Sequence, residues 1–110
     1  MLQALTTPRG ETLSGTPWQV YPRPQMRRDS YINLNGEWDF AVSREEPATF
    51  DMRITVPFCP ESRLSGIGRH FEEGAPLWYR RRFLLPEGFR RKRVLLHIGA
   101  ADQIAEVFVN

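Results

Sequence analysis

The strongest constraint on the fold is the alternation of apolar and polar residues in short segments that end at proline, glycine or charged turns. In residues 37–43, alternate positions carry the large apolar side chains Trp38, Phe40 and Val42. The intervening positions carry Glu37, Asp39 and Ala41. Successive side chains of a strand point to opposite faces, so this period of two predicts a strand with one buried face.

Four further segments have the character of strands, namely residues 52–56, 77–85, 93–99 and 104–109. Residues 93–99 are the most apolar, with Val94, Leu96 and Ile98 on one predicted face, and we expect them at the centre of a sheet. Turns are predicted at Asn35-Gly36, in residues 44–47 and in residues 86–88. Residues 62–76 are predicted to form a long loop with one helical turn.

This arrangement of strands without a convincing helix predicts an all-β fold, and a jelly-roll β-sandwich in preference to a barrel or an α/β fold. The apolar segment before Asn110 is not followed by a returning strand. We therefore expect the sandwich to be incomplete at its C-terminal end. The predicted domain organisation is an extended arm over residues 1–30 and a partial jelly-roll domain over residues 31–110.

The predicted arm is rich in residues that disfavour regular structure. Prolines and glycines interrupt it throughout, at positions 8, 10, 15, 17, 22 and 24. Residues 21–24 should be locally extended, because a residue that precedes proline is displaced from the helical region. Trp18 and Tyr21 are predicted to anchor the arm to the body of the domain.

Composition excludes several classes of protein. The 110 residues carry a net charge of +2 and one cysteine, Cys59, which has no partner for an internal disulfide. No apolar run approaches the ~18 residues of a membrane span, and the N-terminus lacks the features of a secretory signal, so a cytoplasmic location is predicted. Arginine clusters at 80–82 and 90–93 raise the alternative of nucleic-acid binding. Interspersed acidic residues and the strand positions of both clusters argue against that alternative.

The chemistry-bearing residues predict no catalytic centre, metal site or cofactor. The acidic pairs Glu45-Glu46 and Glu72-Glu73 consist of sequence neighbours, whose side chains point apart. The two histidines and Cys59 match no zinc spacing; Cys59 is predicted to be a half-buried packing residue and His97 a satisfied residue on the second face of its strand. The glycines at 66 and 68 lack the strand-and-helix setting of a phosphate-binding loop.

Four motifs, read in order, resemble a known family. They are Leu-Asn-Gly-Glu-Trp-Asp-Phe at 34–40, Ile-Thr-Val-Pro-Phe at 54–58, Leu-Trp-Tyr-Arg-Arg-Arg-Phe at 77–83, and residues 94–102 leading into Val-Phe-Val-Asn at 107–110. This series is similar to the N-terminal sugar-binding domain of glycoside hydrolase family 2, the β-galactosidases and β-glucuronidases. The resemblance covers residues 18–110.

The resemblance implies a jelly roll of the galactose-binding type and, in the parent enzyme, hydrolysis of terminal β-galactosides or β-glucuronides with retention. The two catalytic glutamates of that family lie in a separate (β/α)8 barrel. The chain is accordingly expected to be inactive by itself. It is expected to contact carbohydrate within the parent and to form a homo-oligomer there; the alternative is a free-standing carbohydrate-binding module.

Arg80 is the single residue that the resemblance brings forward as a substrate contact. In some β-galactosidases the corresponding position, which carries asparagine, contributes to the substrate pocket. The rival interpretation is an ion pair from Arg80 to Asp39 or Glu106. Three aromatic residues are also candidates for stacking on sugar rings, although their strand positions favour core packing: Trp38, Trp78 and Tyr79.

Overall fold

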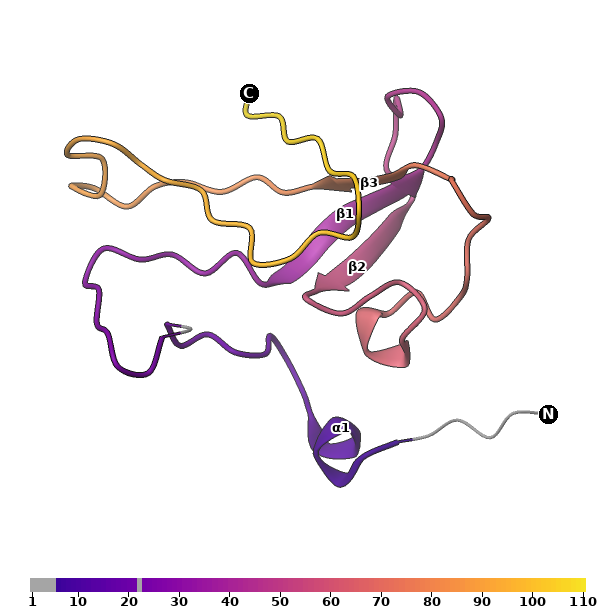
Figure 1. The fold of residues 1–110 in the computed structure, drawn as a ribbon, viewed down its shortest axis with the longest axis horizontal. Coiled ribbons are helices and arrows are strands. Elements are labelled where there is room, and N and C mark those ends of the chain that lie inside the picture. Colours follow the sequence, from indigo (N-terminus) through magenta and orange to yellow (C-terminus); the bar gives the residue numbers. More distant parts are fainter. Residues whose placement is uncertain (1–5, 22) are drawn as a thin grey trace.

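The computed structural model describes residues 6–21 and 23–110, and its centre is a three-stranded antiparallel sheet. The strands are β1 (Gly36–Val42), β2 (Met52–Val56) and β3 (Leu77–Arg80), in the spatial order β2-β1-β3 (Figure 1). A short helix α1 (Pro8–Thr12) and a 3-10 turn η1 (Arg63–Ser65) are the only helical elements of the described residues. The structure is therefore mainly strand and loop, in agreement with the predicted all-β class.

The central strand β1 forms where the alternation is strongest. Its antiparallel partner β2 places Ile54 opposite Trp38, and β3 places Tyr79 opposite Phe40. The predicted strands at 37–43 and 52–56 are confirmed to within one residue. The predicted helical turn in the 62–76 loop is confirmed as η1, which Ser62 caps by accepting a hydrogen bond from the Ser65 amide.

The largest buried apolar side chains lie on one face of this sheet, whereas the buried Ala41 lies on the other. Phe40 and Ile54 are fully buried. The Phe40 ring packs against the edge of Tyr79, with ring centroids 5.1 Å apart, and against Phe71 from the long loop at 5.7 Å. The loop that follows η1 thus closes the apolar face of the sheet, which explains why Phe40 is buried in so small a structure.

The N-terminal arm differs from the prediction at α1. Pro8 was expected to prevent a helix, but it lies in the first turn, where its missing amide hydrogen removes no helical hydrogen bond. The Thr7 side chain caps this turn by accepting a hydrogen bond from the Gly10 amide at 3.1 Å. Residues 1–5 of the predicted arm, and Pro22 of the predicted extended stretch at 21–24, lie outside the described residues.

The two predicted anchors of the arm make aromatic contacts. The Trp18 ring lies 6.2 Å from that of Phe58, and the Trp18 carbonyl accepts a hydrogen bond from the Asn33 side chain at 2.6 Å. Tyr21 packs edge-on against Tyr31 at 4.8 Å. These contacts connect the arm to the segment that precedes β1 in sequence and to the loop that follows β2. Trp18 itself remains 60% exposed.

The predicted turn at Asn35-Gly36 is wrong, because Gly36 is the first residue of β1. Its φ of +123° is a conformation that side chains disfavour. A Cβ atom at this position would lie 3.2 Å from the Arg81 guanidinium and from the Thr16 side chain. Glycine is therefore required here by close packing of the arm and by backbone conformation, and not by a hairpin.

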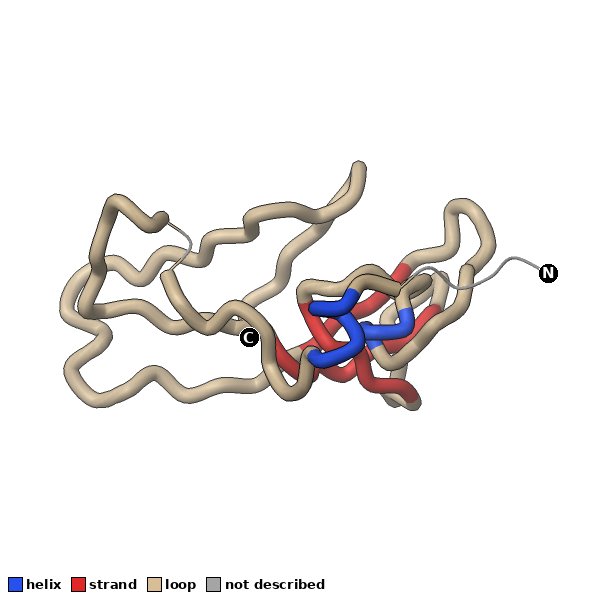
Figure 2. The backbone as a smooth tube through the Cα atoms, turned by 90° about the horizontal axis from the view of Figure 1, so that it is seen from below, coloured by secondary structure: helices blue, strands red, loops and turns tan. Residues whose placement is uncertain are grey.

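The C-terminal third departs most from the prediction. β3 ends at Arg80 instead of continuing to residue 85, and residues 93–99 and 104–109 form no strand. Figure 2 shows this part of the chain as long loops beside the compact group of strands. The predicted turn at 86–88 is present, closed by a hydrogen bond of 3.0 Å from the Phe89 amide to the Pro86 carbonyl. A central position for 93–99 is wrong, since no neighbouring strand lies on either side of it among the described residues.

The core contact at Phe40 allows a direct test of this fold. Phe40→Ala is expected to lower the free energy of unfolding by about 3–5 kcal/mol, because it removes a fully buried ring. Leu84→Ala, at a side chain that is 94% exposed, serves as the control and is expected to cost less than about 0.5 kcal/mol. Urea unfolding followed by tryptophan fluorescence measures both; equal effects would contradict the placement of the core.

Candidate functional site

The sheet face opposite the core carries a row of charged side chains, which we call the charged face: Glu37, Asp39, Arg53 and Arg80. Asp39 on the central strand lies directly opposite Arg53 of β2 and Arg80 of β3. Directly opposed residues of an antiparallel pair share a face, so one carboxylate lies between two guanidinium groups. Arg53 in turn forms an ion pair with Glu37.

Arg80, the residue considered as a sugar contact, is held within this face. Its Nε and Nη2 atoms donate to the Asp39 carboxylate, to one oxygen, at 3.1 and 2.9 Å. Its guanidinium also lies over the Phe50 ring, 4.1 Å from the centroid. The expected ion pair is thus confirmed with Asp39 as the partner instead of Glu106. The contacts make Arg80 a link between β1 and β3.

The charge distribution of this face also acts on Arg53. A hydrogen bond to Glu37 raises the pKa of the Arg53 guanidinium, and the negative charges of Glu37 and Asp39 raise it further. Arginine is already protonated throughout the physiological range, so its charge is constant there. The charged face thus pairs each carboxylate with an arginine, which is the pattern of a solvated structural surface.

The Asp39–Arg80 pair can be measured by a double-mutant cycle. Asp39→Asn and Arg80→Gln, singly and together, are expected to give a coupling free energy of about 0.5 kcal/mol, since both side chains are partly exposed to water. A parallel cycle with Asp39→Asn and Arg82→Gln is the control, and should give no coupling. Urea unfolding measures the free energies; absence of coupling in the first cycle would contradict the ion pair.

The aromatic candidates for sugar stacking are engaged by the chain. The Trp38 indole N–H donates to the Leu34 carbonyl at 2.7 Å, and the Trp78 indole N–H donates to the Ser43 carbonyl at 2.7 Å. Both rings are half-buried. They occupy opposite faces of the sheet, because Trp38 is opposite Ile54 of the core and Trp78 is opposite Ala41 of the charged face. Together they do not form a single platform.

Tyr79 lies at the margin of the core with its side chain partly exposed. Partial burial raises the pKa of its phenol above the ordinary 10.0, and the charges of Glu61 and Cys59 raise it further. A phenol that is harder to ionise in the folded protein favours the folded state while it is protonated. This stabilisation is complete below the unfolded pKa and is lost as pH rises through the folded pKa.

Tyr79→Phe is therefore expected to reduce the loss of stability above about pH 10, because it removes the group that must ionise. Below that pH the variant should unfold at nearly the wild-type urea concentration. Thermal or urea unfolding at a series of pH values from 7 to 11 measures the difference, and the absorbance of phenolate identifies the titration. A wild-type and a variant profile that run parallel across this range would contradict the assignment.

A cleft of about 360 Å³ lies between the N-terminal arm and one end of the sheet. Its lining combines apolar and polar side chains: Leu13, Thr16, Glu37, Thr55, Phe58 and Leu64, with the backbone of Gly15 and Gly36. The volume lies in the range of small-molecule sites. A lining that combines apolar side chains with hydroxyl and carboxylate groups suits a ligand with both apolar C–H faces and hydroxyls.

The cleft was not predicted from the sequence. Its walls come from the arm, the start of β1, the end of β2, the loop after β2 and η1. The one local indication in the sequence was the pair Gly36-Glu37. Gly36 lacks a side chain and so leaves room for Thr16 of the arm, and the next residue carries an exposed carboxylate. The position of Thr16 against that glycine depends on how the arm folds back, which the local pattern does not encode.

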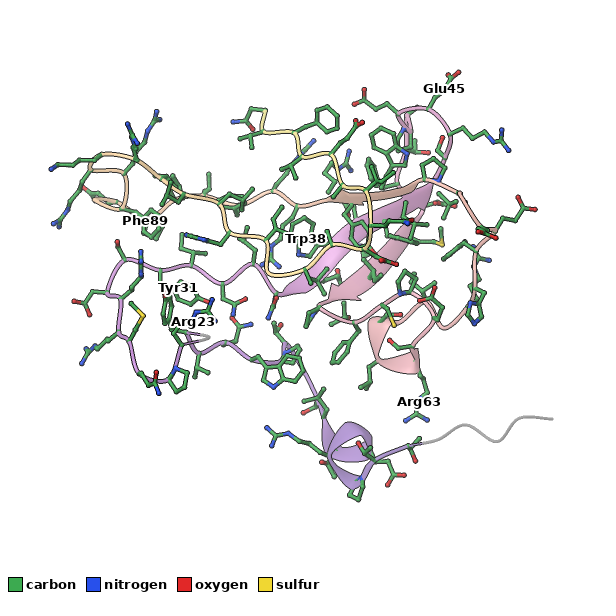
Figure 3. The ribbon with its side chains drawn as sticks, viewed as in Figure 1. Arg23, Tyr31, Trp38, Glu45, Arg63 and Phe89 are labelled. Atoms are coloured by element: carbon green, nitrogen blue, oxygen red, sulfur yellow. The ribbon has the colours of Figure 1, made fainter. Side chains whose placement is uncertain are left out.

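The remaining candidate residues lie apart from one another. All four residues of the acidic pairs are exposed in loops, and Figure 3 shows Glu45 pointing away from the sheet at the outer end of the β1–β2 loop. The prediction that Cys59 is half-buried is wrong, because the side chain is exposed. His97 is exposed in a loop, so its predicted place on a sheet face is also wrong.

His70 lies 4.0 Å from the Glu61 carboxylate, at the surface. Across residues 6–21 and 23–110, no group of three or more histidine, cysteine, aspartate or glutamate side chains is arranged to hold a metal ion. The part of the chain that the structure describes likewise contains no helix long and apolar enough to cross a membrane.

Comparison with known proteins places the chain in no family. No family model matches the sequence. No curated protein matches it either.

Proposed function

We propose that this chain is the sugar-binding domain of a glycoside hydrolase of family 2, which cleaves terminal β-galactosides or β-glucuronides in the cytoplasm. The observation that carries the proposal is the ordered series of four motifs at residues 34–40, 54–58, 77–83 and 94–102. Any one of these motifs is common in strands. Four of them in this order are specific enough to indicate one protein family.

The arrangement of the sheet supports this proposal. The first three motifs supply β1, the end of β2 with the loop that follows, and β3. In the sheet, β2 and β3 flank β1, although the paired residues Asp39 and Arg80 are 41 apart in sequence. A series of motifs that belongs to one domain should meet in space in this way. The proposed fold is a jelly roll, in which residues 93–99 and 104–109 would provide further strands.

The role that we propose for the domain is to bind and position carbohydrate, without breaking the glycosidic bond. Retaining hydrolysis needs two carboxyl groups facing each other across that bond. The acidic pairs of this chain are exposed sequence neighbours, and Asp39 and Glu37 are engaged by arginines. Bond cleavage is accordingly assigned to another part of the parent enzyme.

The cleft beside Gly36 favours a second candidate function, a carbohydrate-binding module that acts by itself. Phe58 can stack on the apolar face of a pyranose, while Glu37, Thr16 and Thr55 offer hydrogen-bond partners for hydroxyl groups. The two candidates differ in whether the isolated chain binds sugar or needs its parent to do so.

Both candidates are tested by titrating the purified chain with methyl β-galactoside, methyl β-glucuronide and, as a control sugar, methyl α-mannoside. Proton NMR saturation transfer measures binding, and chromogenic β-galactosides and β-glucuronides measure turnover. The independent module predicts saturable binding of one β-glycoside at about millimolar concentration, the range of weak affinity. The domain of a parent enzyme predicts no binding by the isolated chain, and neither candidate predicts turnover.

Two variants locate the binding. Phe58→Ala and Glu37→Gln should each weaken it by about tenfold, the loss of one good contact, whereas Phe89→Ala, in the turn after residue 86, should not change it. Turnover that a single glutamate substitution abolishes would refute the non-catalytic role. Binding of neither β-glycoside would refute the independent module. Equal saturation-transfer signals with all three methyl glycosides would refute specific binding of β-glycosides.

A further inference from the structure

Cationic side chains from two distant parts of the sequence gather at one end of the molecule. We call these seven residues the basic end: Arg23, Arg27, Arg28, Arg90, Arg91, Lys92 and Arg93. Figure 1 shows the arm after residue 22 and the loop at 86–93 at the same end of the long axis. The molecule extends 53 Å along that axis but only 23 Å along the view, so depth cannot set the two segments far apart. Figure 3 places Arg23, Tyr31 and Phe89 at this end, and Glu45 and Arg63 away from it.

The basic end is charged differently from the rest of the chain. Residues 23–29 and 86–93 contain its seven cations and two carboxylates, Asp29 and Glu87, which gives a net charge of +5. The whole chain has 15 cations and 13 carboxylates, so the remaining residues carry eight and eleven, a net charge of −3. A localised basic surface on an otherwise acidic chain attracts a polyanion to that one end.

The cations of the basic end are open to solvent. All of these residues are exposed. Within the described residues, the only ion pair that involves any of them joins Arg27 to Asp29 at 3.4 Å, and both of those side chains are more than nine-tenths exposed. Arg80 differs, because Asp39 of the neighbouring strand accepts its hydrogen bonds. Guanidinium groups that no carboxylate of the chain holds are available to an external anion.

The position of residues 90–93 removes an objection to nucleic-acid binding. Both arginine clusters were expected in strands among interspersed acidic residues, which argued against that function. Residues 90–93 lie instead in a loop, directly after the turn that the Phe89 amide closes. Eleven of the 13 carboxylates lie outside the two basic segments. The objection therefore holds for the cluster that begins in β3 with Arg80, and not for the cluster at 90–93.

Aromatic rings accompany these cations. Tyr31 and Phe89 are half-buried, and Tyr21 packs edge-on against Tyr31 at 4.8 Å. The Arg28 guanidinium lies 6.0 Å from the centroid of the Tyr21 ring. Cations that follow a backbone, together with rings on which bases stack, are the means by which proteins bind single-stranded nucleic acid. The described residues of the basic end include no helix that could enter a major groove, which favours single strands over a duplex.

We propose that the basic end binds the phosphate backbone of single-stranded RNA or DNA, and that Phe89 offers a ring on which a base stacks. The cations at 90–93 contact one stretch of the backbone and the arm cations contact the adjoining stretch. Arginine supplies six of the seven cations, and its planar fork matches two oxygens of a phosphate. This surface is independent of the proposed sugar binding, because none of its residues lines the cleft.

Fluorescence anisotropy of labelled oligo(U) and oligo(dT) of about 12 nucleotides, a length within known site sizes, tests the proposal. At physiological salt we expect a dissociation constant of about 1–100 μM for both. Between about 50 and 200 mM salt, the logarithm of the association constant should fall with the logarithm of salt with a slope of about −3 to −5, the value for four to seven phosphate contacts. Absence of binding, or a slope near zero, would overturn the proposal.

Competing polyanions test the class of partner. Polyglutamate, hyaluronate and vesicles of an anionic phospholipid, each at the same concentration of negative charge as the oligonucleotide, should displace little of it, because they lack bases. Displacement by any of the three as effective as that by unlabelled oligo(U) would overturn nucleic acid as the partner.

Three triple variants, each of which removes the same charge, locate the binding. The loop variant carries Arg90→Gln, Arg91→Gln and Arg93→Gln. The arm variant carries Arg23→Gln, Arg27→Gln and Arg28→Gln. The matched control carries Arg9→Gln, Arg44→Gln and Arg63→Gln, at exposed positions outside the basic end.

The loop and arm variants should each raise the dissociation constant by about tenfold or more and reduce the salt slope by about 2, the change for three lost phosphate contacts. The control should alter both quantities much less. Because every substituted residue is exposed, urea unfolding should show folded protein in all three cases. Equal effects of the control and the loop variant, or no effect of the arm variant, would overturn the basic end as the binding surface.

Phe89→Ala tests the stacking contact. We expect it to weaken binding of oligo(U) by about fivefold, the loss of one stacked base. Phe58→Ala, in the cleft, is the control and should leave this affinity unchanged, the reverse of the two variants' expected effects on sugar. Unchanged affinity in Phe89→Ala, or equal affinity for a duplex of the same length, would overturn the preference for single strands.

Discussion

The burial of Phe40 in the central strand is the interaction on which the rest of the structure depends. β2 and β3 both pair with β1 and not with each other, so β1 holds the sheet together. Phe40 lies in that strand opposite Met52 and Tyr79, and its ring meets Phe71 from the loop that returns across the face. One side chain therefore joins three segments that are distant in sequence. The charged face, the cleft and the aromatic contacts are all positioned relative to it.

The opposite face of β1 shows how an arginine-rich chain can form a sheet without leaving free positive charge there. Asp39 lies opposite both Arg53 and Arg80, and Arg53 forms an ion pair with Glu37. Cross-strand pairing thus satisfies the guanidinium groups of Arg53 and Arg80 locally. Arg81 points the other way and donates to the Leu34 and Asn35 carbonyls at 2.9 and 3.0 Å, which fixes the entry into β1.

Sequence reasoning succeeded where the cause of structure was local. β1 and β2 are joined by a short connection, and their alternation selects both strands and the face that Phe40 buries. For Arg80, an ion pair to Asp39 or to Glu106 was the rival of a sugar contact, and the structure has the pair with Asp39. Pro8 was misread because its effect depends on its place in the helix, and the cleft was missed because Thr16, Gly36 and Phe58 come together only through the path of the arm. Cys59 was misjudged because its neighbours Phe58 and Pro60 turn inward without it.

The segment at 93–99 is instructive because its pattern is as regular as that of β1. Val94, Leu96 and Ile98 alternate as Trp38, Phe40 and Val42 do, yet only the second set forms a strand. The alternation of apolar and polar residues indicates which side chains are stabilised by burial. A strand also requires a neighbouring strand with which its backbone forms hydrogen bonds. β1 has two such neighbours within its own chain, and residues 93–106 have none among the described residues. For residues 93–99, the alternation is therefore not sufficient by itself to form a strand.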